Sequence, residues 1–234
     1  MRLGVPFVLE EDLATSRKVI ARAVNSESNA YQVGATEILR TTVENRQGRI
    51  SIEATITDAG TQRNRGIIRV EGNSSGALVA PVNALAKRMD ERAIDFSTNN
   101  NRALEAFTAA AESANTATRA QMLDAAISVD PGFGLGYIAL AETLAQTREQ
   151  NVEALLRTAA SHSGSFSPLD AARLRLLSAQ LSKAPLAQQE GASTAVLQLA
   201  PNNVDALVAL GSDRFLEGDR EGGKRFLGLA VELN

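Results

Sequence analysis

The chemistry open to this chain is narrowed first by the residue types that it lacks. Its 234 residues include one His and no Cys. Disulfides, thiolate metal sites and cysteine nucleophiles are therefore excluded, and so is any zinc motif that needs two histidines. The remaining candidates are a glycine-rich segment, one imidazole, and groups of carboxylates and arginines.

The segment from Gly218 to Arg225 nearly reproduces a phosphate-binding loop. It contains the glycines and Lys224 of that motif, but Arg225 stands where Ser or Thr would hold Mg²⁺. The motif also needs a preceding strand, whereas the residues before Gly218 have helical spacing. We interpret the segment as a turn between helices and expect no cofactor.

His162 and two acidic groups could supply acid–base or metal-binding chemistry. His162 lies in the Ser/Gly-rich stretch 161–165 with no nucleophile pattern beside it, and is interpreted as a loop residue. The acids of 10–12 suit a helix N-terminus, where they interact favourably with the helix dipole. Both this group and the acids of 90–95 are expected on the surface. The sequence therefore predicts no catalytic residue, no metal ligand and no enzyme.

Five arginines gather around two expected hairpin turns and could bind an anion or an acidic partner: Arg46, Arg49, Arg63, Arg65 and Arg69. Acidic residues interleave with them, so solvated hairpin ends are the favoured interpretation. The whole chain has 24 Lys+Arg against 27 Asp+Glu, a net charge of −3. This balance argues against nucleic acid as the main partner.

No apolar run reaches the roughly 20 residues that a membrane-spanning helix needs. The first residues have a short apolar stretch, followed by acids, without the features of a signal peptide. A cytoplasmic protein and the soluble part of an exported one both fit, so the compartment stays open.

Alanine divides the chain into two regions. Residues 1–99 contain 12 Ala and residues 100–234 contain 27. Alternating β-branched residues belong to the first region and helical spacing to the second. The polar run 97–101 between them is typical of a short linker and helix N-cap. We therefore predict two domains, 1–99 and 100–234.

The first region is expected to be an α+β domain, in which two helices cover one face of an antiparallel sheet. The clearest strand runs from Ile50 to Thr57, with apolar and polar residues alternating. Pro81 is acceptable only in the first turn of its helix. The remaining expected elements are a strand over 3–8, a helix over 9–25, a strand over 31–43, a turn at 45–48, a strand over 66–71 and a helix over 78–93.

Two stretches of this region, Tyr31–Thr36 and Gly48–Ala59, resemble the small TolB-N-terminal-like domain. The resemblance covers about residues 30–95 and departs from the family pattern before them. In bacteria, such domains often precede tetratricopeptide (TPR) arrays. The resemblance implies no catalytic residues.

The second region is divided by prolines. Pro131, Pro168 and Pro201 lie 37 and 33 residues apart, close to the TPR period. Small residues at Ala126, Ala141, Gly211 and Ala230 would let helices approach closely. The region resembles a TPR array, most clearly around Leu210–Gly211. This resemblance implies a superhelical stack of four helix pairs, at 100–133, 134–169, 170–203 and 204–234.

In TPR proteins, the first helices of the repeats line a concave surface that holds a peptide. The resemblance implies that surface here at Thr108, Glu142, Gln146, Ser178, Asp205, Ser212 and Phe215. The Lys/Arg/Asn clamp that binds C-terminal carboxylates in some TPR proteins is absent.

The favoured function is a non-enzymatic scaffold or adaptor that binds a protein or peptide. Two alternatives are a sensory or regulatory region of a larger bacterial kinase or transcription regulator, and a structural spacer. An enzyme, such as a carboxylate-based hydrolase, would need deep acids with raised pKa values. The sequence does not identify the partner or the oligomeric state.

Overall fold

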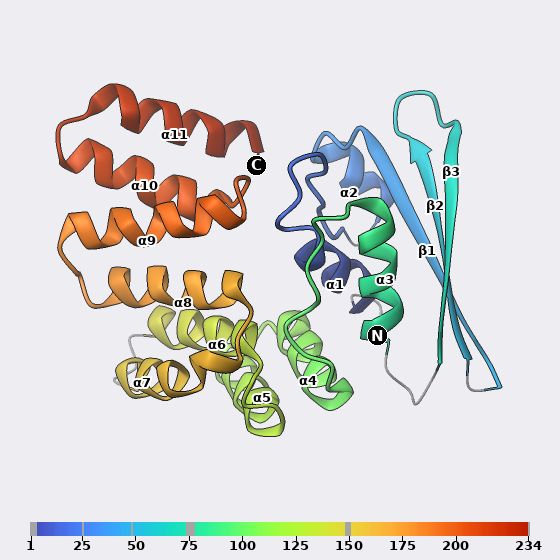
Figure 1. The fold of residues 1–234 in the computed structure, drawn as a ribbon, viewed down its shortest axis with the longest axis horizontal. Coiled ribbons are helices and arrows are strands. Elements are labelled where there is room, and N and C mark those ends of the chain that lie inside the picture. The colour runs from blue at the N-terminus through green and yellow to red at the C-terminus, as the bar shows by residue number, and fades with distance from the viewer. Residues whose placement is uncertain (1–3, 25, 48, 74–77, 148–150, 234) are drawn as a thin grey trace. The chain divides into compact units, whose positions relative to one another are not determined.

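The computed structural model describes residues 4–24, 26–47, 49–73, 78–147 and 151–233 (Figure 1). The chain forms two compact units. Unit 1 is Met1–Asn101 and unit 2 is Arg102–Asn234. Unit 1 is an α+β domain, and the described part of unit 2 consists almost entirely of helices.

Unit 1 contains a three-stranded sheet and helices before and after it. Its elements are α1 (Gly4–Asp12), α2 (Glu27–Gln32), β1 (Glu37–Arg46), β2 (Arg49–Asp58), β3 (Asn64–Asn73) and α3 (Val79–Met89).

The sheet is an antiparallel meander in the order β1-β2-β3. The expected alternation holds along the first half of β2, where Ile50, Ile52 and Ala54 are buried. Thr57 is also buried, but on the other face of the sheet, beside its β1 partner Ile38, because side chains alternate along β2 and cross-strand partners share a face. A register shift interrupts the β2–β3 ladder between Ile56 and Thr57, and its extra residue, Arg65, is a β-bulge in β3.

Helix α3 packs on β2 and β3, and α1 packs on α3. Val79, Val82 and Leu85 of α3 are fully buried, as is Ile52 of β2, so they form the centre of this layer. Pro81 lies in the first turn of α3, where its missing N–H costs no helical hydrogen bond.

The expected strand over 3–8 is wrong, because residues 4–12 form helix α1. Its buried residues Val5, Val8 and Leu9 are three or four positions apart, which is helical spacing. The expected helix over 9–25 is also wrong beyond Asp12. Ile20, assigned to its apolar face, is 53% exposed, and the chain around it is irregular.

The expected strand over 31–43 begins later than predicted. Tyr31 lies in α2, and Val33 and Gly34 end that helix, with Gly34 at φ 71°. β1 starts at Glu37 and continues through Arg46. It therefore includes Asn45 and Arg46, which the sequence assigned to a turn. Gly48 lies outside the described residues.

The described part of unit 2 contains eight α-helices. They are α4 (Asn101–Glu112, beginning at the last residue of unit 1), α5 (Thr116–Val129), α6 (Gly134–Gln146), α7 (Val152–His162), α8 (Pro168–Leu181), α9 (Leu186–Leu199), α10 (Val204–Leu216) and α11 (Arg220–Leu233). Successive helices pack from α5 to α7 and from α8 to α11, and α6 also packs on α8 (Figure 1).

Polar side chains fix the starts of several of these helices. Asn115 Oδ1, Ser167 Oγ and Asn203 Oδ1 accept hydrogen bonds from backbone N–H groups three residues later. Pro131 and Pro201 follow the ends of α5 and α9, whereas Pro168 is the first residue of α8, a favourable position for proline.

In the part of the chain that the structure describes, no helix is both long enough and apolar enough to cross a membrane.

Candidate interaction surface

The residues expected on the concave, peptide-binding surface lie on the first helices of the expected pairs. Thr108 is in α4, Glu142 and Gln146 are in α6, Ser178 is in α8, and Asp205, Ser212 and Phe215 are in α10.

Thr108 does not reach the surface. It is 6% exposed, and its hydroxyl donates to the carbonyl of Leu104 in the preceding turn (2.9 Å). Glu142 and Gln146 are exposed one turn apart on α6, and Ser178 is half-buried on α8. The candidate surface is therefore most developed on α10.

One exposed face of α10, here called the α10 stripe, consists of Asp205, Val208, Ser212 and Phe215. These residues are three or four positions apart, so they follow one side of the helix. Val208 is 42% and Phe215 38% exposed. The Ser212 hydroxyl donates to the Val208 carbonyl (2.8 Å), so it is satisfied within the helix. The stripe thus presents one carboxylate in the first turn of α10 and two apolar side chains closer to its C-terminus.

Val208 was not among the residues predicted for the groove. The sequence contains a signal for it, because Val208 is three residues after Asp205 and four before Ser212. Apolar residues in helices are more often buried, and the neighbouring Leu207 and Leu210 are buried as that rule expects.

Phe215 is held in place by the helix that follows. A Cβ atom added to Gly223 of α11 would lie 2.5 Å from Cδ2 of the Phe215 ring. The ring therefore rests directly on the backbone of α11. Similarly, a Cβ on Gly211 would lie 2.8 Å from Leu227 Cγ, so this small residue brings α10 and α11 together as expected.

An ionic cluster lies beside the C-terminal end of the stripe. Arg214 forms an ion pair with Glu190 of α9, and its guanidinium lies 3.8 Å from Glu217 and 4.0 Å from Asp219. Burial, followed by the charges of Glu217 and Glu190, raises the pKa of Asp213. The cluster ties α9 to α10 and leaves the surroundings of the stripe acidic.

The glycine-rich segment has the structure of a turn between helices. It follows α10 rather than a strand, and Gly218 has φ 89°, which glycine adopts without strain. Asp219 Oδ1 accepts a hydrogen bond from the Gly222 N–H (2.9 Å). Lys224 and Arg225 lie inside α11, not in a phosphate-binding loop.

The arginines of the two hairpins do not form one patch. Because β2 is antiparallel to both neighbours, Arg46 and Arg49 lie at one end of the sheet and Arg63 and Arg65 at the other (Figure 1). Arg69 lies within β3 and pairs with Glu53 across the ladder (2.6 Å).

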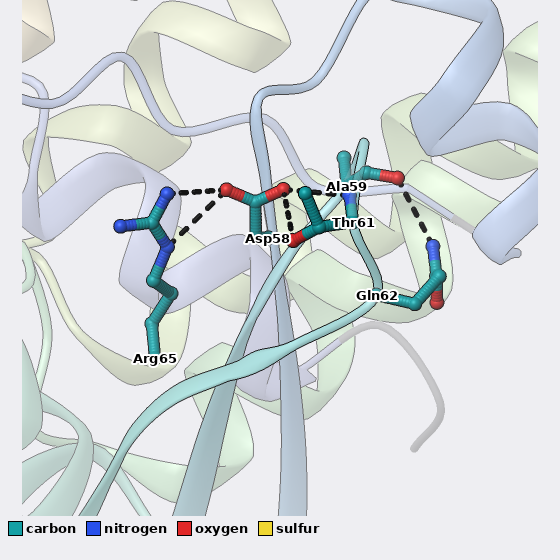
Figure 2. Close-up of polar contacts among 5 residues, drawn as sticks. All are labelled: Asp58, Ala59, Thr61, Gln62 and Arg65. Atoms are coloured by element: carbon teal, nitrogen blue, oxygen red, sulfur yellow. Dashed lines mark hydrogen bonds and ion pairs between the residues drawn. The ribbon is translucent and has the colours of Figure 1, made fainter.

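Asp58 organises the second of these turns (Figure 2). Its carboxylate accepts hydrogen bonds from the Thr61 N–H (2.8 Å) and hydroxyl (2.9 Å), and it pairs with Arg65. The hydrogen bond from Arg65, followed by those from Thr61, holds the pKa of Asp58 well below its usual range. Gln62 Nε2 donates to the Ala59 carbonyl (3.0 Å). Arg65 is therefore occupied in shaping the turn.

His162 is not a loop residue. It is the last residue of α7 and is half-buried. Its ring stacks on that of Tyr137, with centroids 6.1 Å apart and planes at 25°. Tyr137 also contacts Phe166. The imidazole therefore belongs to a ring cluster that packs α6 against α7.

The acids of 10–12 are not all on the surface. Asp12 ends α1 with 0% exposure, and its Oδ1 has no hydrogen-bond partner. The Asn83 amide, oriented by its partners, donates to Asp12 Oδ2 (2.9 Å) and to the Val79 carbonyl (3.1 Å). Burial, assisted by the charges of Asp95 and Glu11, raises the pKa of Asp12 to about 8.

A carboxyl group with a raised pKa is a feature of acid–base catalysts, but Asp12 lacks the access that catalysis requires. A fully buried side chain cannot contact a substrate in this conformation. Asp90, also buried, accepts a hydrogen bond from the Ser16 hydroxyl (2.6 Å) and from the Arg92 N–H (2.9 Å). The Asp12 carboxyl therefore joins α1 to Asn83 of α3, and Asp90 joins the segments at Ser16 and Arg92. Among the described residues, no group of three or more His, Cys, Asp or Glu could hold a metal ion.

No protein-family model and no curated protein sequence matches this chain.

Proposed function

We propose that the chain is a non-enzymatic interaction scaffold, whose helical unit binds a protein or peptide on the face that contains the α10 stripe. The observation that carries this proposal is the exposure of Val208 and Phe215 on one side of α10. Apolar side chains grouped on one helix face are typical of surfaces that bind another chain.

The construction of α10 supports the proposal. Its opposite side is anchored by Leu207 and Leu210, and Phe215 is supported by the backbone at Gly223. A surface on rigid elements loses little conformational entropy when it binds. The resemblance to TPR arrays, in which the first helix of each repeat contacts the ligand, favours the same face.

The composition of the stripe indicates the chemistry of the partner. Its two apolar side chains lie between acidic residues along the chain. Asp205 precedes them in α10, and Glu217 and Asp219 follow the helix. A complementary segment would present apolar side chains next to a cationic group. Glu142 on α6 is a second exposed carboxylate on a first helix.

Affinity capture with matched variants tests this function. Val208→Glu would place a charge in the stripe. Val231→Glu makes the same change at another exposed valine, on α11, which is 76% exposed. We expect Val208→Glu to lose the captured proteins and Val231→Glu to retain them. The charge reversals Glu142→Lys and Asp205→Lys should also weaken capture, with Glu153→Lys on α7 as their control.

Circular dichroism of each variant would establish that it is folded. Capture of the same proteins by the parent, Val208→Glu and Asp205→Lys would count against the proposal, because the partners would then bind elsewhere on the chain. Capture of no protein by the parent would favour a structural spacer.

A further inference from the structure

Strand β1 forms an open edge of the sheet in unit 1. The described residues form three strands in the order β1-β2-β3, so no described strand pairs with the outer side of β1. Alternate backbone N–H and C=O groups of β1 point to that side. The strand has 10 residues and contains no proline. An edge of this kind can pair with a further strand.

The opposite edge, β3, is protected. A bulge at Arg65 interrupts its ladder, since Ile56 pairs with Gly66 and Thr57 with Asn64. The carbonyl of Arg69 accepts a hydrogen bond from Arg88 Nη1 of α3 (2.7 Å). Bulges and covering side chains are the usual means of blocking an edge strand. The two edges therefore differ, and β1 is the one available for pairing.

The charges of β1 are complementary to themselves. Arg40, Thr42 and Glu44 lie on one face of the strand, because side chains alternate. If two copies of β1 pair antiparallel with Thr42 facing Thr42, each Arg40 faces Glu44 of the other copy. Opposite charges directly across two strands stabilise the pair.

This register is preferred over its neighbour. Moving the pairing so that Val43 faces Val43 would place Arg40 opposite Arg46 of the second copy. Like charges in that position are destabilising. We propose that two copies of this chain associate through β1, antiparallel and centred on Thr42, so that their sheets become continuous.

The present partners of these charges do not oppose the association. Arg40 pairs with Glu27 (2.6 Å), and Glu44 pairs with Arg46 (2.9 Å). These side chains are between 41% and 80% exposed, and exposed ion pairs contribute little stability. On the other face, Val43, which is 44% exposed, would gain Thr41 of the second copy as a cross-strand neighbour.

A charge-swap experiment on the full chain tests this association. Sedimentation measurements over a range of concentrations give the dimer dissociation constant. Arg40→Glu places two acids opposite each other at both ends of the pairing, and Glu44→Arg places two arginines there. We expect each single variant to dimerise about tenfold more weakly than the parent. An equimolar mixture of the two variants restores opposite charges and should dimerise as the parent does.

The mixture also serves as a control for folding, because damage to the fold in either variant would not be repaired by mixing. Glu71→Arg changes an exposed charge on β3 and should leave the dissociation constant unchanged. The proposal is overturned if the parent has the mass of one chain at every concentration, if mixing restores nothing, or if Glu71→Arg weakens the dimer as much as Arg40→Glu.

Discussion

At the scale of single residues, the environment of Asp12 opposes the charged form of its carboxyl group. Its side chain is fully buried, Oδ1 has no hydrogen-bond partner, and burial raises its pKa to about 8. The charge of Lys87 lowers the pKa of Asp12, but Lys87 is itself paired with Asp95 (2.5 Å). At neutral pH the folded protein therefore keeps Asp12 protonated, whereas the unfolded chain releases the proton.

The stability of unit 1 should consequently fall as the pH rises from about 4 to about 8. Below this range Asp12 is protonated in both states, and above it the residue is ionised in both. Between these limits the folded state binds one more proton, so the free energy of unfolding falls by about 1.4 kcal/mol per pH unit. Denaturant unfolding at several pH values measures the slope.

Asp12→Asn should remove most of this slope between pH 5 and 8, because the amide has no proton to release. It should also raise the free energy of unfolding at pH 7.5. Glu91→Gln makes the same type of change at an exposed acid and should leave the slope as it is. An unchanged slope in Asp12→Asn would show that another group titrates in this range.

At the scale of elements, the packing of α10 on α11 depends on which glycines face the neighbouring helix. Gly223 and Gly228 are both in α11 and five residues apart. A Cβ on Gly223 would lie 2.5 Å from the Phe215 ring, whereas a Cβ on Gly228 would have no atom within 4 Å. One glycine is required for packing, and the other only costs backbone entropy.

Alanine at these two positions should therefore have opposite effects. Gly223→Ala should lower the free energy of unfolding by about 1–3 kcal/mol, because the Phe215 ring or α11 must move. Gly228→Ala should raise it by about 0.5–1 kcal/mol, since alanine is the better helix former. Urea unfolding of the two variants measures both. If both variants are destabilised equally, the loss of stability would come from a change within α11 and not from its contact with α10.

At the scale of the whole molecule, the chain forms two compact units. Asp12 lies in the core of unit 1, and Gly223 lies in unit 2. Residues that share no contacts and no network usually act independently on stability. Changes at the two sites should therefore affect different parts of the protein.

When Asp12→Asn and Gly223→Ala are combined, their effects on the free energy of unfolding should add, within about 0.5 kcal/mol. Amide hydrogen exchange would resolve the two units, with α3 responding to the first change and α10 to the second. A response of α10 to Asp12→Asn would instead show that the units unfold together.

The elements that could be predicted from sequence are those specified by local pattern. The alternation of Ile50, Ile52 and Ala54 predicts β2, and the periodic helices of unit 2 are specified in the same way. The segment after α1 is different, because the Ser16 hydroxyl binds Asp90, 74 residues away. The spacing of neighbouring residues contains no signal for a contact over that distance in sequence.

The candidate surface shows the same division. Asp205, Ser212 and Phe215 could be placed on one face of a helix from their spacing alone. The burial of Thr108 and the exposure of Val208 depend on which sides of α4 and α10 their neighbours cover. That is decided by packing between helices, which residue spacing within one helix does not contain.

The positions of the two hairpin turns limit how arginines of unit 1 can be used. Arg49 and Arg65 lie near opposite ends of a sheet about 30 Å long. A single phosphate or carboxylate can reach one of them and never both. Only an elongated polyanion, lying along the strands, could connect them, and it would pass the carboxylates of Glu44 and Glu71 on its way.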